Sequence, residues 1–126
     1  MPPSHDSNLS QLIIKVAEIV RKLNILTRGG NILRPQTTSV SVDFNINADI
    51  IYVTTSGGAV TILLPPAADM QDREIYIKDA TGNAATNNIT IDANGSETID
   101  SGTTYVANTN WQSVKIVSNG VAWFII

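Results

Sequence analysis

The residues with the most evident chemical potential in this chain are one histidine and a small group of acids. His5 is the only histidine among the 126 residues, and there is no cysteine. A Ser-His-Asp triad or a histidine-ligated zinc ion would need His5 in a rigid site. Its place in a polar N-terminal segment instead predicts a solvated side chain. The lack of cysteine excludes disulfides and thiolate metal sites.

Asp69, Asp72 and Glu74 form a small acidic cluster. Paired carboxylates act as general acid and base in glycoside hydrolases, and clustered carboxylates bind calcium. We interpret this cluster instead as part of a solvated loop. The run DANG at residues 92–95 lacks the distal bidentate glutamate of an EF-hand and is better explained as a turn. We therefore predict no catalytic residue, no cofactor and no metal site.

The aromatic residues offer a different kind of chemistry. Tyr52 and Tyr76 fall within expected strands, whereas Tyr105, Trp111 and Trp123 come late in the chain. Exposed tyrosine or tryptophan rings could stack on sugars, as at a receptor-binding tip, and the alternative is packing in the core or at sheet edges. The chain has no glycine-rich phosphate motif.

The net charge of −3 conceals an asymmetry along the chain. Residues 1–35 carry a net charge of +3 and residues 36–126 a net charge of −6. Binding to nucleic acid needs clustered lysine and arginine, so the acidic body argues against that partner. We interpret the five basic residues of the first segment as contacts to an acidic protein partner: Lys15, Arg21, Lys22, Arg28 and Arg34.

Residues 9–26 show the period of an amphipathic helix. Apolar residues recur at spacings of three and four, as at the a and d positions of a heptad. These residues are Leu9, Leu12, Val16, Ile19, Leu23 and Leu26. Ile13 and Val20 widen the stripe at the e position, and Gly29-Gly30 ends the helix. A helix of about 18 residues is marginal alone in water, so the stripe needs a partner.

Three partners compete for this stripe: the β segments of the same chain, a membrane surface and copies of the same helix. The β segments pair among themselves and offer no obvious free face, and the stripe has no aromatic anchor for a membrane surface. We favour copies of the same helix over packing on the β segments of its own chain, which stays an alternative, and the width of the stripe favours three copies. The sequence therefore predicts a homotrimer held by an N-terminal helical bundle.

The first strands are expected soon after the helix. Residues 31–38 read as a connector, and residues 40–46 alternate apolar and polar side chains as in a half-buried strand. Residues 50–55 and 60–64 also alternate, and Gly57-Gly58 between them predicts a hairpin. Pro65-Pro66 ends the pairing.

Short strands separated by turn residues continue to the C-terminus. They are expected at residues 74–78, 89–91, 98–99, 104–107, 113–118 and 121–126. Asn94-Gly95 and Asn119-Gly120 are hairpin signals. The last strand is apolar on both faces, so we expect it to be central or buried against another subunit. About eight such strands predict a mainly β protein, with an antiparallel β-sandwich or barrel over residues 36–126 behind an N-terminal segment of residues 1–35.

The β segment resembles a module common in virion proteins of tailed bacteriophages, especially tail fibres. The matching pieces are SGGAVTILLPPA, DREIYIKDATGNAATNNITI and GSETIDSGTTYVANTNWQSVKIVSNGVAWFII, which keep the order of the module over roughly two-thirds of the chain. The resemblance implies a β-sandwich-like unit, often in trimers, to which no catalytic residue is attached. It also implies phage capsid or tail proteins as partners.

These observations lead to one functional hypothesis with two alternatives. We expect a non-enzymatic structural protein, made in the host cytoplasm and assembled into the virion as a trimeric capsid decoration, cement or head-fibre protein. A receptor- or glycan-binding tail-fibre module is the first alternative, with a host surface glycan as partner. A polysaccharide depolymerase is the second, although the carboxylates show no convincing pairing. The N-terminus does not resemble a signal peptide, and no apolar run is long enough for a membrane span.

Overall fold

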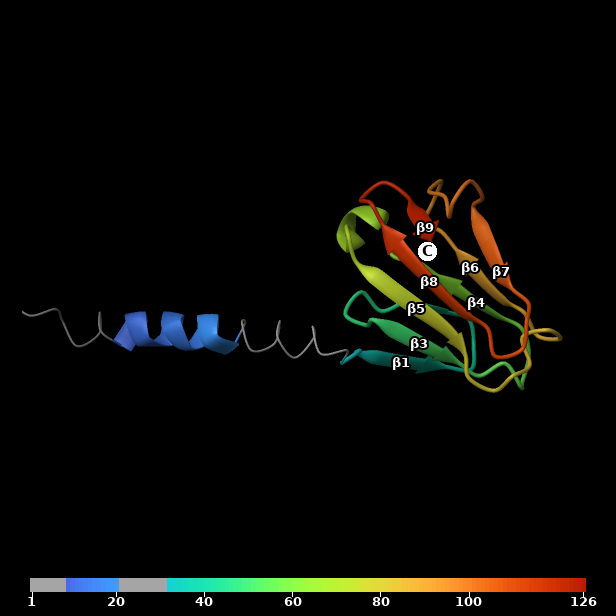
Figure 1. The fold of residues 1–126 in the computed structure, drawn as a ribbon, viewed down its shortest axis with the longest axis horizontal. Coiled ribbons are helices and arrows are strands. Elements are labelled where there is room, and N and C mark those ends of the chain that lie inside the picture. The colour runs from blue at the N-terminus through green and yellow to red at the C-terminus, as the bar shows by residue number, and fades with distance from the viewer. Residues whose placement is uncertain (1–8, 21–31) are drawn as a thin grey trace, which may run out of the picture. The chain divides into compact units, whose positions relative to one another are not determined.

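A computed structural model describes residues 9–20 and 32–126 of the chain (Figure 1). The chain divides into two units, Met1–Leu33 and Arg34–Ile126. In the first unit, residues 9–20 are α-helical, as their apolar period predicts. The second unit, here called the β body, is built from strands.

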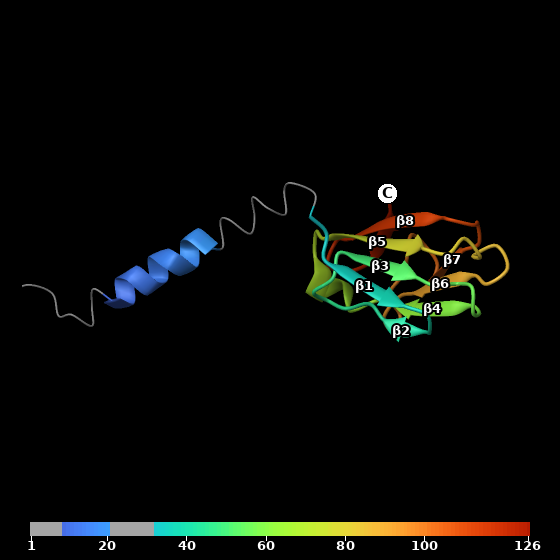
Figure 2. The same cartoon turned by 90° about the horizontal axis from the view of Figure 1, so that it is seen from below.

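The described part of the β body contains nine strands and one 3-10 turn. In chain order these are β1 (Pro35–Thr38), β2 (Val42–Asp43), β3 (Ile50–Val53), β4 (Val60–Leu63), η1 (Ala67–Met70), β5 (Glu74–Asp79), β6 (Ile89–Asp92), β7 (Thr104–Ala107), β8 (Ser113–Ser118) and β9 (Trp123–Ile125). They form a five-stranded sheet in the order β1-β3-β5-β8-β9 and a four-stranded sheet in the order β2-β4-β6-β7. The two sheets face each other (Figure 2).

From β1 to β6 the chain changes sheet at every connection. β1, β3 and β5 therefore lie side by side in one sheet and run parallel, and β2, β4 and β6 do the same in the other. The later pairs, β5–β8, β8–β9 and β6–β7, are antiparallel. Both sheets are mixed, so the expectation of a wholly antiparallel domain is wrong.

The connection around Gly57-Gly58 does not form the hairpin that the sequence predicts. Residues 54–59 carry the chain from β3 in one sheet to β4 in the other, instead of reversing it within one sheet. The inward residues of both strands are buried, among them Ile51, Val53, Val60 and Ile62. Crossing between the sheets lets both apolar rows enter the same core from opposite sides. The predicted hairpin at Gly57-Gly58 is therefore wrong.

The two Asn-Gly pairs, unlike Gly57-Gly58, do form turns. β8 and β9 pair antiparallel across Asn119-Gly120, which confirms that hairpin. Gly120 has a φ of +92°, a backbone conformation that favours glycine. Asn94-Gly95 forms a turn, with the Glu97 amide donating to the Asn94 carbonyl at 3.0 Å, but it lies within a longer connection from β6 to β7.

Both ends of the β body depart from expectation. Pro35–Thr38, expected as a connector, forms β1 at a sheet edge, where a first-position proline is tolerated. Of the strand expected at residues 40–46, only Val42–Asp43 pairs, as β2. The last strand was expected to be central or covered by another subunit. Within the single chain, β9 is the other edge of the five-stranded sheet.

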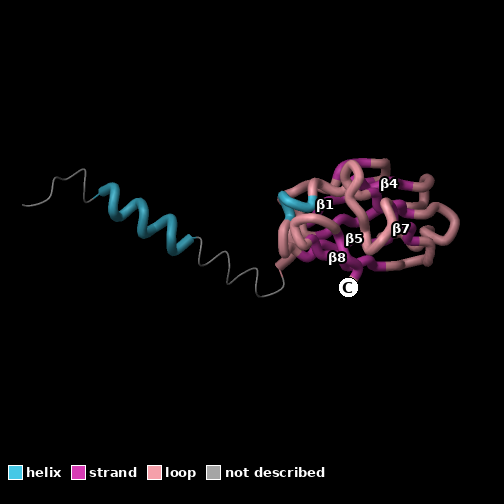
Figure 3. Tube along the Cα trace, turned by 90° about the horizontal axis from the view of Figure 1, so that it is seen from above, coloured by secondary structure: helices cyan, strands magenta, loops and turns pink. Residues whose placement is uncertain are grey.

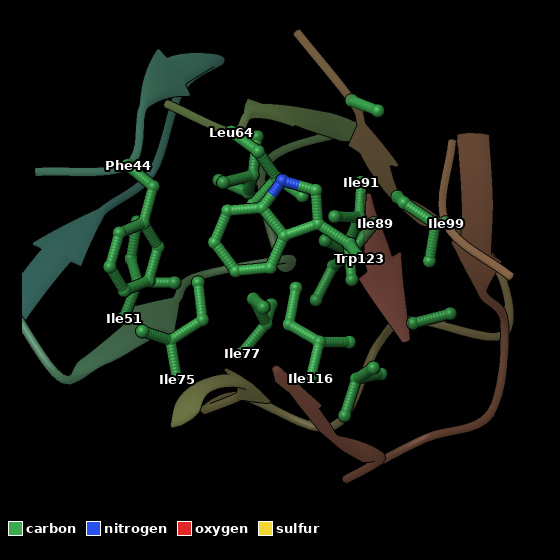
Figure 4. Close-up of a cluster of buried hydrophobic side chains, with 14 of the residues drawn as sticks. Phe44, Ile51, Leu64, Ile75, Ile77, Ile89, Ile91, Ile99, Ile116 and Trp123 are labelled. Atoms are coloured by element: carbon green, nitrogen blue, oxygen red, sulfur yellow. The ribbon is translucent and has the colours of Figure 1, made fainter. Parts of the chain in front are cut away.

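The core between the sheets centres on Trp123, whose indole lies among isoleucine side chains from several strands (Figure 4). Side chains from both sheets form one buried cluster. Trp123 has no exposed surface, and its Nε1 has no hydrogen-bond partner among the described residues. An unpaired buried N–H costs about 1–3 kcal/mol. The large apolar area of the ring offsets this cost.

We expect Trp123→Ala to lower the free energy of unfolding by about 3–5 kcal/mol, because it leaves a large cavity. Val121→Ala is the matched control, since that side chain is 76% exposed, and should change stability by less than about 0.5 kcal/mol. Urea denaturation followed by circular dichroism measures both. Equal effects of the two substitutions would contradict the assigned core.

Candidate functional site

The predicted assembly stripe is exposed along the described part of the helix. Its members Leu9, Leu12, Val16 and Ile19 are 51–64% exposed. Ile13 and Val20, which widen the stripe, are also exposed. Leu23 and Leu26 lie outside the described residues. The helix by itself thus buries none of these large apolar side chains, and leaving them in water would be costly without a partner.

The predicted docking cations fall into two groups. Lys15 lies on the helix and is exposed, whereas Arg21, Lys22 and Arg28 lie outside the described residues. Arg34 makes a bidentate pair with Asp49, with Nε 2.9 Å from Oδ2 and Nη2 3.1 Å from Oδ1. The Arg34 amide also donates to Oδ2, at 2.8 Å. Arg34 therefore has a structural role at the start of the β body, in addition to the predicted docking role.

The acidic cluster does not form a site. Asp69 lies in η1 and is exposed, as is Asp72 in the turn that follows. Glu74 pairs with Lys115 at 3.3 Å. Among the described residues, no group of three or more histidine, cysteine, aspartate or glutamate side chains could hold a metal ion. His5 lies outside the described part.

The most strongly built polar feature is the buried carboxylate of Asp79, at the end of β5. Asp79 has no exposed surface, and five donors surround it. Oδ1 accepts from the Thr55 hydroxyl at 2.7 Å and from the amides of Thr81 and Gly82 at 3.2 and 3.0 Å. Oδ2 accepts from the amides of Ala84 at 3.1 Å and Trp111 at 2.9 Å. One side chain thus joins three loops.

These hydrogen bonds keep the carboxylate charged. Burial by itself raises the pKa of Asp79, but the hydrogen bonds from Thr55 and from the amides of Trp111, Ala84 and Thr81 outweigh it. The pKa falls from its ordinary 3.8 to about 2. A carboxylate that accepts several amide hydrogen bonds shows this behaviour.

The Asp79 network holds Trp111 in an unusual conformation. Trp111 has a φ of +66°, a left-handed conformation that is disfavoured for a bulky residue. Its amide donates to Asp79, and Lys78 Nζ donates to its carbonyl oxygen. The residue is 59% exposed. A Cβ added at Gly82 would collide with Cε2 of Trp111, so the indole lies directly against the glycine backbone.

The loops around Trp111 gather at the end of the β body where β3 and β5 finish, and Figure 3 shows loops at both ends of the strands. Residues 54–59, 80–88 and 108–112 contain no charged side chain. We call this group of loops the Trp111 end. At the opposite ends of β2 and β4, a groove of about 280 Å³ is lined by Asp43, Phe44, Ile46, Leu63, Leu64, Pro65, Pro66 and Asn94.

Sequence reasoning left Asp79 out and kept Trp111 among several aromatic candidates. A strand-end aspartate followed by small and polar residues is typical of a side chain that bonds the next amides, and this signal could have drawn attention to Asp79. No sequence signal places the Trp111 amide 32 residues away in the same network.

Comparisons with known proteins add no family to this description. No protein-family model matches the chain, and no curated protein is significantly similar to it. In the described part of the chain, none of the helical residues forms a segment with the length and apolar character needed to cross a membrane.

We expect Asp79→Asn to lower the free energy of unfolding by about 3 kcal/mol, because the amide group turns a donor toward amides that need an acceptor. Asp92→Asn is the matched control, at the end of β6 with a half-buried side chain, and should cost less than about 0.5 kcal/mol. Urea denaturation at neutral pH compares them. A cost for Asp79→Asn no larger than the control would remove Asp79 from its structural role.

The pKa of Asp79 also predicts an acid dependence. Because its folded-state pKa lies below the unfolded value, the stabilisation is complete above about pH 4 and is lost as the pH falls toward 2. The shift corresponds to roughly 2 kcal/mol. Between pH 5 and pH 2, Asp79→Asn should therefore lose about 2 kcal/mol less stability than the natural chain. Parallel losses in the two proteins would contradict the assignment.

Proposed function

We propose that this protein is a structural component of a bacteriophage virion, a trimeric capsid decoration, cement or head-fibre protein. In this proposal the N-terminal helices form a three-stranded bundle, and the β body is a β-sandwich carried by it. The function is mechanical and requires no catalytic group.

The observation that carries the proposal is the apolar stripe on the helix. Leu9, Leu12, Val16 and Ile19 are each at least half exposed on the helix. Burying such side chains contributes roughly 1.5–3 kcal/mol each. Three copies of the helix can bury the stripe together with the flanking Ile13 and Val20, which a two-stranded seam leaves partly open.

The β body fits a passive role. It has a continuous apolar core, and charged residues make up 15% of the chain, below the usual quarter. The carboxylate of Asp79 is fully buried and surrounded by hydrogen-bond donors, so it is not presented to a substrate. The resemblance of this part to virion modules supports the same role.

Docking on the particle is assigned to the basic N-terminal segment. Residues 1–35 carry a net charge of +3 and residues 36–126 a net charge of −6. Lys15 and the neighbouring cations Arg21, Lys22 and Arg28 would meet an acidic surface of a capsid or tail protein. Electrostatic complementarity of this kind orients partners and speeds their encounter.

A second candidate function is a receptor- or glycan-binding tail-fibre module. The observation that favours it is Trp111, an aromatic residue that is 59% exposed and lies among loops whose own side chains are uncharged. Exposed tryptophan is uncommon on a surface that binds nothing. The two candidates are compatible, since a trimeric fibre can carry a binding site.

The assembly seam is tested by Ile19→Asp in the full-length chain. A charge at the d position should break the bundle and reduce the native mass from three copies to one. Ile14→Asp is a closely matched control, because Ile14 is also exposed on the helix, at 58%, but lies outside the a, d and e positions. Native mass spectrometry should find it trimeric. A trimeric Ile19→Asp protein would refute the seam.

The virion role is tested on purified particles of the phage that encodes the chain. We expect the chain in particle digests at a copy number that is a multiple of three, and antibody labelling at one defined position on the particle. Absence of the chain from purified particles would refute the structural role, independently of its oligomeric state.

A further inference from the structure

We propose that the Trp111 end of the β body is a carbohydrate-binding platform for neutral sugars, with the indole of Trp111 as the stacking surface. This inference deepens the second candidate function and rests on it. It does not require the helical bundle, because every residue involved belongs to the β body.

The two tryptophans of the chain have opposite environments. Trp123 is fully buried, whereas Trp111 is 59% exposed. Core packing therefore explains the first and not the second. Gly82 covers one side of the Trp111 ring so closely that even a methyl group would collide with it. An exposed aromatic residue whose ring lies against backbone on one side is suited to stacking on the C–H face of a sugar ring.

The backbone that carries the ring is held by hydrogen bonds. The Trp111 amide is fixed by Asp79 and its carbonyl by Lys78. The loop that carries the ring is braced by Gln112, whose Oε1 accepts from the amides of Asn108 and Thr109 at 3.0 and 3.1 Å. A preorganised surface binds more tightly because less freedom is lost on binding.

The conformation of Trp111 itself points to a ligand. A bulky residue at a φ of +66° is strained, and such strain persists where the surrounding structure enforces it. Here the enforcing groups are Asp79 and Lys78, and the exposed ring makes little core contact in return. Backbone outliers of this kind concentrate at binding sites.

The surroundings define the class of ligand. Residues 80–88 and 108–112 supply asparagine and threonine side chains and no charge, and a single cation, Lys78, reaches the Trp111 carbonyl beside them. Asn83 and Asn110 are exposed, and the side-chain Oδ1 of Asn110 accepts from the Ala85 amide at 2.9 Å, which fixes the Asn110 side chain beside the platform. Such groups suit sugar hydroxyls. Stacked nucleic-acid bases would need clustered cations for the phosphates, which these loops lack.

The test probes the full-length chain with an immobilised array of neutral hexose and N-acetylhexosamine oligosaccharides. We expect binding to at least one of them, and Trp111→Asn should weaken it by about tenfold or more, equivalent to about 1.4 kcal/mol. Asparagine tolerates a positive φ, so this variant removes the ring and keeps the loop. Phe124→Ala, an exposed aromatic of β9, is the matched control and should bind like the natural chain.

Two readouts separate this inference from the assembly proposal. Trp111 fluorescence should change on titration with the bound sugar, while Trp123 is shielded in the core. A trimeric natural chain that binds no sugar on the array overturns the platform and leaves the trimer standing. Unchanged sugar binding by a folded Trp111→Asn variant also overturns it. Sugar binding by a monomeric chain supports the platform and refutes the trimer.

Discussion

The buried carboxylate of Asp79 is the interaction on which one whole end of the molecule depends. It joins the end of β3, through Thr55, to the loop after β5, through the amides of Thr81, Gly82 and Ala84, and to the loop before β8, through Trp111. A buried charge is tolerated only when donors replace the lost water, and here five donors do so. Without Asp79, the amides of Thr81, Gly82, Ala84 and Trp111 would lose these acceptors.

The same constraint explains how a mixed topology can be stable. The chain changes sheet at every connection from β1 to β6, so each sheet grows by parallel neighbours that are far apart in sequence. Crossing loops cannot satisfy their amides by pairing as hairpins do. Asp79 at one end, and the Arg34–Asp49 pair at the other, bond the loop backbone instead. The central apolar cluster around Trp123 then joins the two sheets.

The two units divide the proposed work. The helix offers an exposed apolar stripe and belongs to the basic segment, which suits assembly and docking. The β body is acidic and well packed, and it presents a fixed aromatic ring among uncharged loops. An assembly element joined to a rigid body with a binding face is the arrangement expected of a virion appendage. Each half of this proposal rests on different residues.

The sequence by itself determined the local features of this protein. The three- and four-residue spacing from Leu9 predicted the helix, alternation predicted most strands, and Asn119-Gly120 predicted the last hairpin. These signals succeed because the side-chain period and the turn chemistry act between neighbours in the chain. The sequence also predicted alternating apolar residues in the strands on both sides of Gly57-Gly58. It did not predict to which sheet each strand belongs.

Only the tertiary structure decided which strands pair and which residues meet. A strand with one apolar face packs equally well in a hairpin or across two sheets, so alternation cannot tell β3 beside β4 from β3 beside β5. Asp79 and Trp111 are 32 residues apart, and their meeting depends on β5 pairing with β8. The contact of the exposed Trp111 ring with Gly82 also follows from that pairing. A long-range contact of this kind leaves no local pattern in the sequence.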